Sequence, residues 1–175
     1  MPPDRSIFLI GYRGTGKTTI AQELAERFGC AWADSDDIVQ TRAGKPVADI
    51  FADEGERFFR DLEQAVVAEL AAGPTQVVAL GGGAVLREAS QRAIDGMHVV
   101  WLKATPEVIA ERLSADAASA SLRPSLTGAG LTEEIEQVLT QRTPIYQQCA
   151  TLEVDTEGRT PQAIAAEILQ QLTAN

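Results

Sequence analysis

The stretch GYRGTGKTT, residues 11–19, constrains the fold more than any other feature of this chain. Its first eight residues satisfy the pattern G-x-x-x-x-G-K-[ST], in which glycines let successive backbone N–H groups turn toward phosphate oxygens. The apolar run SIFLI precedes it and the helix-like segment IAQELAERF follows it. The pattern therefore predicts a strand, a phosphate-binding loop (P-loop) and a helix whose positive N-terminal end faces the phosphates.

The polar residues of this loop predict a nucleotide site. We expect Lys17 to reach the β- and γ-phosphates and the Thr18 hydroxyl to bind Mg²⁺. The other residues of the loop expected to contact the nucleotide are Gly14, Thr15, Gly16 and Thr19.

Apolar runs and helical patterns alternate along the rest of the chain. Strands are expected within 6–12, 30–37, 75–83, 98–104 and 150–156, and helices within 17–28, 47–73, 105–115, 131–148 and 160–172. The second helix should break near Gly55. Continuous apolar strands alternating with helices predict an α/β domain with a parallel sheet covered on both faces. Residues 114–130, rich in Ala, Ser and Gly, form a long connection that predicts a lid or a disordered loop.

The length of 175 residues predicts one domain over 1–175. The formal net charge of −10 argues against general binding to nucleic acid or anionic membranes. Arginines and lysines must then gather locally wherever an anion binds. Without a secretory leader or a run of about 18 apolar residues, a cytoplasmic protein is expected. Cys30 and Cys149 have no metal-binding or disulfide pattern.

A P-loop alone does not identify the reaction. The D-x-x-G switch and N-K-x-D base-binding motif of a GTPase are missing from the sequence. VVALGGG stands where a strand could deliver a Walker B acid, so Asp34 is the nearest candidate for carboxylate support of the metal.

Three further segments should lie near the P-loop. They are DSDD (34–37), FFRDLE (58–63) and LGGGAV (80–85). The first and third follow strands, and the loops after parallel strands share the carboxyl edge of a sheet, where ligands bind. There an acid can deprotonate an attacking hydroxyl, glycine N–H groups can approach an acceptor closely, and Arg60 can hold a carboxylate.

In these motifs the chain resembles the shikimate kinase family of small P-loop kinases, over nearly its whole length. GYRGTGKTT is similar to the family's ATP loop, DSD to its D-x-D, FRDLE to its F-R-x-x-E, and GGG to its glycine triplet. RPSL resembles the lid motif R-P-L, and QRTPIY the segment R-x-P-x-Y. The ordered set is much more specific than the P-loop alone.

The resemblance implies a fold. It is a three-layer P-loop kinase fold, with a five-stranded parallel sheet of order 2-3-1-4-5 between helices, a shikimate-binding region at about 34–62 and a mobile lid at about 114–126. The implied activity is ATP-dependent phosphorylation of the 3-hydroxyl of shikimate, on the route to chorismate and the aromatic amino acids, with one Mg²⁺ ion.

The resemblance also implies roles for single residues. Asp36 would bind shikimate and act as base toward its 3-hydroxyl, and Asp34 would hold a water of the Mg²⁺ shell. Arg60 and Arg142 would bind the shikimate carboxylate. Gly82 and Gly83 would supply backbone donors, and Arg123 would supply a cation in the lid. Arg112 and Arg159 would lie near the adenine.

Several of these residues have simpler interpretations. Asp36 could be a helix N-cap, Arg142 or Arg112 a surface charge, and Arg159 a turn residue. Glu63, three residues after Arg60 on a helix, is expected to orient that arginine. In contrast, Arg13 is interpreted as solvated, His98 as structural, and Trp32 and Trp101 as core or sheet packing.

Two other functions stay open at this point. A gluconate kinase or another small P-loop kinase would keep the loop and the lid. A nucleotide-binding regulator would bind nucleotide without transferring phosphate. The expected partners are the small molecules ATP and shikimate, and the expected state is a monomer.

Overall fold

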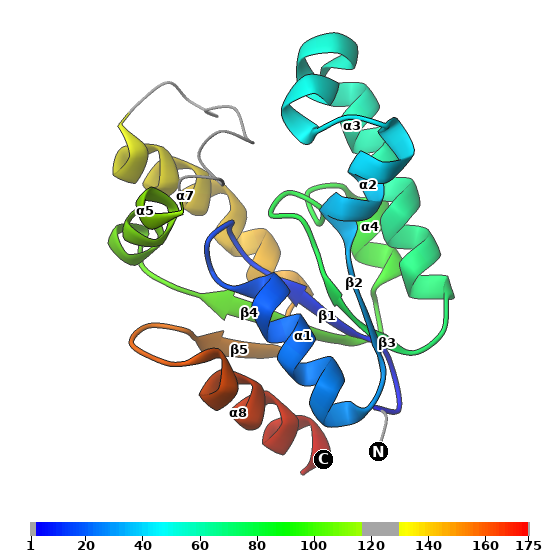
Figure 1. The fold of residues 1–175 in the computed structure, drawn as a ribbon, viewed down its shortest axis with the longest axis vertical. Helices are drawn as coiled ribbons and strands as arrows, with labels where there is room; N and C mark the ends of the chain where they lie inside the picture. The colour runs from blue at the N-terminus through cyan, green and yellow to red at the C-terminus, as the bar shows by residue number, and fades with distance from the viewer. Residues whose placement is uncertain (1–2, 117–129, 175) are drawn as a thin grey trace.

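The computed structural model describes residues 3–116 and 130–174 (Figure 1). Its centre is a five-stranded sheet of order β2-β3-β1-β4-β5 in which every pairing is parallel. The strands are β1 (Ile7–Ile10), β2 (Ala31–Asp34), β3 (Gln76–Ala79), β4 (His98–Lys103) and β5 (Leu152–Asp155). The sheet order implied by the resemblance is confirmed.

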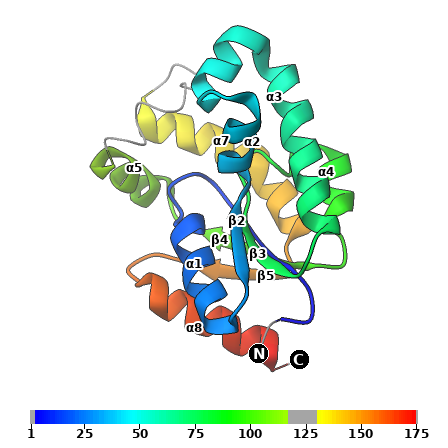
Figure 2. The same ribbon diagram turned by 45° about the vertical axis from the view of Figure 1, so that its right-hand side comes forward.

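Helices lie on both faces of the sheet (Figures 1 and 2). They are α1 (Lys17–Phe28), α2 (Ser35–Ala43), α3 (Val47–Ala72), α4 (Glu88–Ala93), α5 (Pro106–Ala115), α7 (Leu131–Cys149) and α8 (Pro161–Thr173). Successive side chains of β1 lie on opposite faces of the sheet. Ile7 and Leu9 pack with α1 and α8, whereas Phe8 and Ile10 pack with α3 and α7. This alternation produces three layers with one apolar core on each side of the sheet.

The central strands are buried on both faces, as the continuous apolar runs predict. Every residue of β1 and β3 is buried. The edge strand β2 differs, because Trp32 remains 39% exposed. Of the two expected places for Trp32, core or sheet packing, the core is wrong, because Trp32 lies in the sheet opposite Val77 and stays partly exposed. Trp101 on β4 is 5% exposed and packs as expected.

The strongest helix signals are confirmed. Gly29 ends α1 in the left-handed conformation, with φ 65°. Gly55 interrupts α3 at φ 82°, where the sequence predicts a break. Thr160 caps α8 by accepting a hydrogen bond from the Ala163 N–H. Such signals depend only on residues next to each other in the chain, which is why the sequence reveals them.

Two helices have no counterpart in the sequence-based expectation. In α2 only Ser35 and Val39 are buried, and in α4, which has six residues, only Ser90 is buried. Neither helix presents an apolar stripe of normal width, so periodicity does not reveal it. Helix α2 matters because it begins directly after β2, so the DSDD acids lie at the carboxyl edge of the sheet.

Candidate active site

The P-loop connects β1 to α1 and requires glycine at defined points. Gly11, Gly14 and Gly16 have φ values of 138°, 79° and 90°, which L-residues with side chains rarely adopt. A Cβ on Gly11 would also lie 2.5 Å from the Leu102 carbonyl oxygen on β4. The loop conformation thus follows directly from its glycines.

Polar side chains within the P-loop bind its own carbonyl groups. The Lys17 ammonium donates to the carbonyl oxygens of Gly11 and Tyr12, each at 2.8 Å. The Thr15 hydroxyl donates to the Tyr12 carbonyl at 2.8 Å and is buried. The loop is therefore shaped for phosphate by its own residues.

The Thr18 hydroxyl lies beside a carboxylate. It donates a 2.7 Å hydrogen bond to Asp34 Oδ2, while Asp34 Oδ1 accepts from the Asp36 N–H at 2.9 Å. Asp34 is thus the N-cap of α2, and the interpretation of Asp36 as that N-cap is wrong. An alcohol oxygen next to a carboxylate oxygen fits a Mg²⁺ ion, a hard cation that prefers oxygen ligands. Residues 3–116 and 130–174 contain no group of three or more His, Cys, Asp and Glu side chains that could hold a metal.

A polar pocket extends over the P-loop. It encloses about 1110 Å³ of space, including the solvent at its mouth. Its walls come from the P-loop and from the ends of β2, β3 and α5: Arg13, Gly14, Gly16, Lys17, Thr18, Thr19, Asp34, Asp36, Leu80, Gly81, Gly82, Arg112, Leu113 and Asp116. We refer to it as the nucleotide pocket.

The two arginines expected near adenine lie in different surroundings. Arg112 lines the nucleotide pocket and donates to the Thr156 hydroxyl and carbonyl at 3.0 and 2.9 Å. Arg159 does not line this pocket; it donates to the Asp155 carbonyl at 3.0 Å and forms an ion pair with Glu167. The structure brings Arg112, and not Arg159, to the described part of the pocket.

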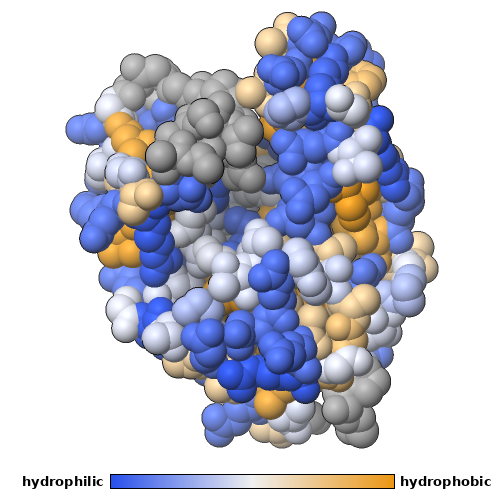
Figure 3. Space-filling model, in the orientation of Figure 1, coloured by the Kyte–Doolittle hydropathy of each residue, from blue (hydrophilic) through white to orange (hydrophobic). Residues whose placement is uncertain are grey.

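A second, more apolar pocket lies beside the first. It encloses about 550 Å³ on the same basis and is lined by Tyr12, Arg13, Asp36, Val47, Phe51, Phe59, Arg60, Glu63, Gly82, Gly83 and Arg142. We refer to it as the acceptor pocket. The expected residues Asp36, Arg60 and Arg142 all line it, together with the apolar side chains of α3. Figure 3 shows the molecular surface hollowed between the α3 side and the α5 side.

Arg60 is fixed by a nearly buried carboxylate. Arg60 Nη1 donates to Glu63 Oε2 at 2.6 Å, and the more exposed Glu56 lies 3.6 Å from Arg60 Nε. Burial raises the pKa of Glu63, and the charge of Arg60 opposes that shift. Glu63 contacts Arg60 as the sequence predicts, and this contact limits the orientations of the guanidinium group.

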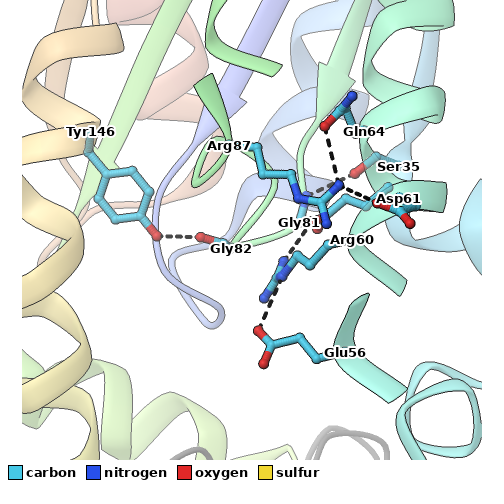
Figure 4. A network of polar contacts seen from close by, with 10 residues as sticks. Ser35, Glu56, Arg60, Asp61, Gln64, Gly81, Gly82, Arg87 and Tyr146 are labelled. Carbon is cyan, nitrogen blue, oxygen red and sulfur yellow. Dashed lines mark hydrogen bonds and ion pairs between the residues drawn. The ribbon is translucent and has the colours of Figure 1, made fainter. Parts of the chain in front are cut away.

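The glycine triplet leaves little room for side chains. A Cβ on Gly83 would lie 2.5 Å from Arg60 Nη1, and one on Gly82 would lie 3.4 Å from Arg142 Nη1. The Gly81 N–H donates to the Ser35 hydroxyl, and the Gly82 carbonyl accepts from the Tyr146 hydroxyl at 2.6 Å (Figure 4). The triplet is therefore needed for close approach, because none of its glycines has a positive φ.

The hydroxyl of Tyr146 joins α7 to this triplet. Its side chain is fully buried, and burial raises the pKa of Tyr146, opposed by the nearby Arg142. Arg142 lies one helical turn before Tyr146 on α7, which follows β4 and α5 in the chain. The hydrogen bond to Gly82 thus holds the helix that carries Arg142 against the acceptor pocket.

The two pockets share a wall. Arg13, Asp36 and Gly82 line both of them. A carboxylate, a guanidinium group and a backbone segment therefore meet where a ligand in one pocket would touch a ligand in the other. This arrangement suits group transfer between two bound molecules.

The surroundings of Arg13 differ from those predicted from the sequence. Its side chain is only 13% exposed and lies 3.4 Å from a carboxylate oxygen of the buried Glu134 on α7, so the interpretation as a solvated residue is wrong. The motif G-x-x-x-x-G-K-[ST] leaves this position unspecified, and no local signal reveals its surroundings. The apolar wall was also missed. Val47 and Phe51 recur at helical spacing, whereas Phe59 lies beyond the break at Gly55.

One expected site residue cannot be placed. Arg123 lies outside the described residues, as do positions 117–126 of the expected lid. In the described part of the chain, no helix is both long enough and apolar enough to cross a membrane.

Comparisons with known proteins identify the family of this chain. The family model described as shikimate kinase matches residues 13–173. A shikimate kinase of Rhodopirellula baltica is 43% identical over 165 residues, which cover 94% of this chain and 88% of that protein. The structure of a shikimate kinase from Acinetobacter baumannii in complex with shikimate superposes with a TM-score of 0.91 at 31% identity, covering 100% of this chain and 95% of the other.

A gluconokinase from Sinorhizobium meliloti is also similar in structure. Its TM-score is 0.59 at 18% identity, with 99% of this chain and 94% of the other covered. At that identity the likeness concerns the fold alone. The gluconate kinase alternative is therefore not favoured.

Proposed function

Because the chain belongs to the shikimate kinase family, we propose that it transfers the γ-phosphoryl group of ATP to the 3-hydroxyl of shikimate. The products are shikimate 3-phosphate and ADP. The observation that carries this proposal is the wall of Arg13, Asp36 and Gly82 shared by the nucleotide and acceptor pockets. It lets two ligands meet without a covalent enzyme intermediate, in agreement with phosphoryl transfer by positioning and charge stabilisation.

The acceptor pocket suits a small, hydroxylated carboxylate. Arg60 and Arg142 are the cations for its carboxylate, and Gly82 and Gly83 offer backbone donors to its oxygens. Val47, Phe51 and Phe59 would cover an apolar face of the ring. The chain carries a net charge of −10, so this local pair of arginines is the basis of anion binding.

Asp36 is the proposed general base, because it is the carboxylate on the shared wall. It accepts the proton of the 3-hydroxyl as the substrate oxygen bonds to the γ-phosphorus. The bond from that phosphorus to the β,γ-bridging oxygen breaks, and ADP leaves with the electron pair. Lys17 contacts the β- and γ-phosphates. Arg123 keeps its proposed role as a lid cation on the basis of the sequence alone.

One Mg²⁺ ion is proposed to accompany ATP. The Thr18 hydroxyl would bind it directly and Asp34 through a water molecule, since these two oxygens already lie side by side. When bound, the ion neutralises charge on the phosphates.

The proposal extends to the state of the protein in the cell. The five strands form a single sheet, which supports one domain over 1–175, and a monomer is the proposed active form. Light scattering coupled to size-exclusion chromatography tests the monomer. The cytoplasm is the proposed location, since the family acts in biosynthesis.

The test is ADP release from ATP and Mg²⁺ with shikimate, gluconate or AMP supplied separately, followed by mass spectrometry of the acceptor. ADP formation with a phosphate mass gain in shikimate alone is the expected result. Transfer to gluconate or AMP instead would overturn the roles of Arg60, Arg142 and the glycine triplet but not the nucleotide pocket. ATP binding without transfer to any acceptor would support a nucleotide-binding regulator.

A further inference from the structure

We propose that Arg13, in the P-loop, is a further catalytic residue whose guanidinium group contacts the phosphoryl group during transfer. The inference rests on the proposed function, because it concerns the reaction of that same site. It assigns a role to a position that the P-loop motif leaves unspecified.

The first argument is position. Arg13 is the only cation among the three residues on the shared wall, the others being Asp36 and Gly82. Its backbone nitrogen lies 3.5 Å from where a Cβ of Gly82 would stand, so the P-loop and the glycine triplet are packed together at residue 13. A group passing from one pocket to the other would therefore pass this side chain.

The second argument is that the guanidinium group is held in place but not saturated. It lies 5.9 Å from the centre of the Tyr12 ring, and its Nη2 is 3.4 Å from Glu134 Oε1, a long contact for an ion pair. The Nε atom of Arg13 is buried and has no hydrogen-bond partner among the described residues. A buried donor without a partner is unfavourable, so a small rearrangement of the guanidinium group that brings Nε to an anionic oxygen would be favourable.

The third argument is charge. Among the described residues, the nucleotide pocket is lined by three cations, Arg13, Lys17 and Arg112, and by three carboxylates, Asp34, Asp36 and Asp116. Arg112 already donates to Thr156, away from the shared wall. A phosphoryl group in transfer spreads negative charge over its equatorial oxygens, close to the carboxylate of Asp36. A cation between the two pockets offsets that repulsion.

Two other roles for Arg13 predict different behaviour. If it bound the shikimate carboxylate alongside Arg60 and Arg142, its loss would raise the KM for shikimate. If it served only to neutralise Glu134, its loss would lower the melting temperature, and removing the charge of Glu134 would have the same kinetic effect.

The experiment compares Arg13→Met and Arg13→Lys with wild type, with Arg92→Met as the control because Arg92 is 70% exposed on α4. Arg13→Met is expected to lower kcat by about 100-fold or more. The KM for shikimate should change by less than about threefold. Arg13→Lys should retain part of the activity, because lysine keeps the charge but loses the planar fork. Arg92→Met should leave kcat unchanged.

A binding measurement separates transfer from substrate binding. Calorimetry with ADP, Mg²⁺, aluminium fluoride and shikimate provides a mimic of the phosphoryl group in transfer. Arg13→Met should weaken binding of this mixture by at least about 10-fold while leaving the Kd for ADP and Mg²⁺ alone unchanged.

Three results would overturn the inference: an unchanged kcat, a rise in shikimate KM with kcat unchanged, or equal kinetic losses in Arg13→Met and Glu134→Gln accompanied by lower melting temperatures. Each would leave the proposed function standing if wild type phosphorylates shikimate. Failure of wild type in that reaction would instead contradict the proposed function itself.

Discussion

The nucleotide and acceptor pockets share a wall but are built in different ways. The P-loop of the nucleotide pocket is one continuous segment. The side chains of Lys17 and Thr15 stabilise it by hydrogen bonds to carbonyl groups of the same loop. The acceptor pocket brings Arg60 from α3, Gly83 from beyond β3 and Arg142 from α7. The shape of the P-loop is thus a local property of the chain, whereas the acceptor pocket depends on tertiary packing.

The largest effect is expected on the wall where the two pockets meet. Asp36→Asn should lower kcat by about 10²- to 10⁴-fold, because the amide cannot accept the proton of the acceptor hydroxyl. The melting temperature should change little, since Asp34 and not Asp36 caps α2. Steady-state kinetics and thermal unfolding check both points, with the neighbouring, exposed Asp37→Asn as the matched control. Normal turnover in Asp36→Asn would remove Asp36 from the role of base.

The next effect should fall on the acceptor pocket alone. In Gly83→Ala the new methyl group overlaps the Arg60 guanidinium, and displacing this group should lower kcat/KM for shikimate by about 100-fold. The KM for ATP should stay within about threefold, because the P-loop does not depend on Arg60.

Gly82→Ala provides the matched comparison for Gly83→Ala. Its methyl group would stand 3.4 Å from Arg142 Nη1, a tight contact that a small shift relieves. Its loss in kcat/KM should therefore be smaller. Equal losses in the two variants, or a loss of ATP binding in Gly83→Ala, would contradict the separation of the two pockets.

A third prediction concerns the nucleotide side. Arg112→Ala removes the hydrogen bonds to Thr156 and should raise the KM for ATP by about 10-fold. Arg159→Ala should change it by less than about twofold, since Arg159 is paired with Glu167 outside the pocket. Titration with ATP at saturating shikimate distinguishes the two arginines. The reverse order would assign the adenine side to Arg159.

The smallest kinetic effect is expected from Glu63→Gln. The glutamine keeps a hydrogen bond to Arg60, so the KM for shikimate should rise only about threefold. Stability gives the sharper measurement. Because burial raises the pKa of Glu63 above its usual value of 4.5, the folded chain holds this proton more tightly than the unfolded chain does.

The sign of the pH dependence follows from that shift. The stability contributed by Glu63 is fully present below pH 4.5 and is lost as the pH rises through the folded-state pKa. The glutamine in Glu63→Gln does not titrate between pH 4.5 and the folded-state pKa of Glu63. The melting temperature of this variant relative to wild type should therefore rise across that pH interval. Thermal unfolding of both proteins across the interval checks it, and a relative melting temperature that falls would show that Arg60 outweighs burial.

The same difference between the pockets explains what the sequence could predict. The P-loop and the break at Gly55 depend on adjacent residues, so local patterns reveal them. The parallel sheet follows from its apolar strands, and its strand order came through the family resemblance. The motifs of that resemblance also pointed to Asp36, Arg60 and Arg142, which the structure brings to one pocket.

Other features depend on long-range packing and have no local signal. Arg13 is largely covered and contacts Glu134, which is 121 positions away in the chain, and Trp32 is exposed on the edge strand β2. Helix α2 carries Asp36 but buries too few apolar residues to show a helical period. Such properties depend on the whole fold, and a sequence motif reveals them only when it includes both contacting residues.

The shared wall also has a consequence for inhibitor chemistry. A molecule that joins a ring carboxylate to a nucleoside diphosphate through a short phosphate linker would occupy both pockets at once. Its second half would bind at a high effective concentration, so its affinity could exceed that of either half by about 10²- to 10⁴-fold. The linker must run past Arg13, Asp36 and Gly82, which line both pockets.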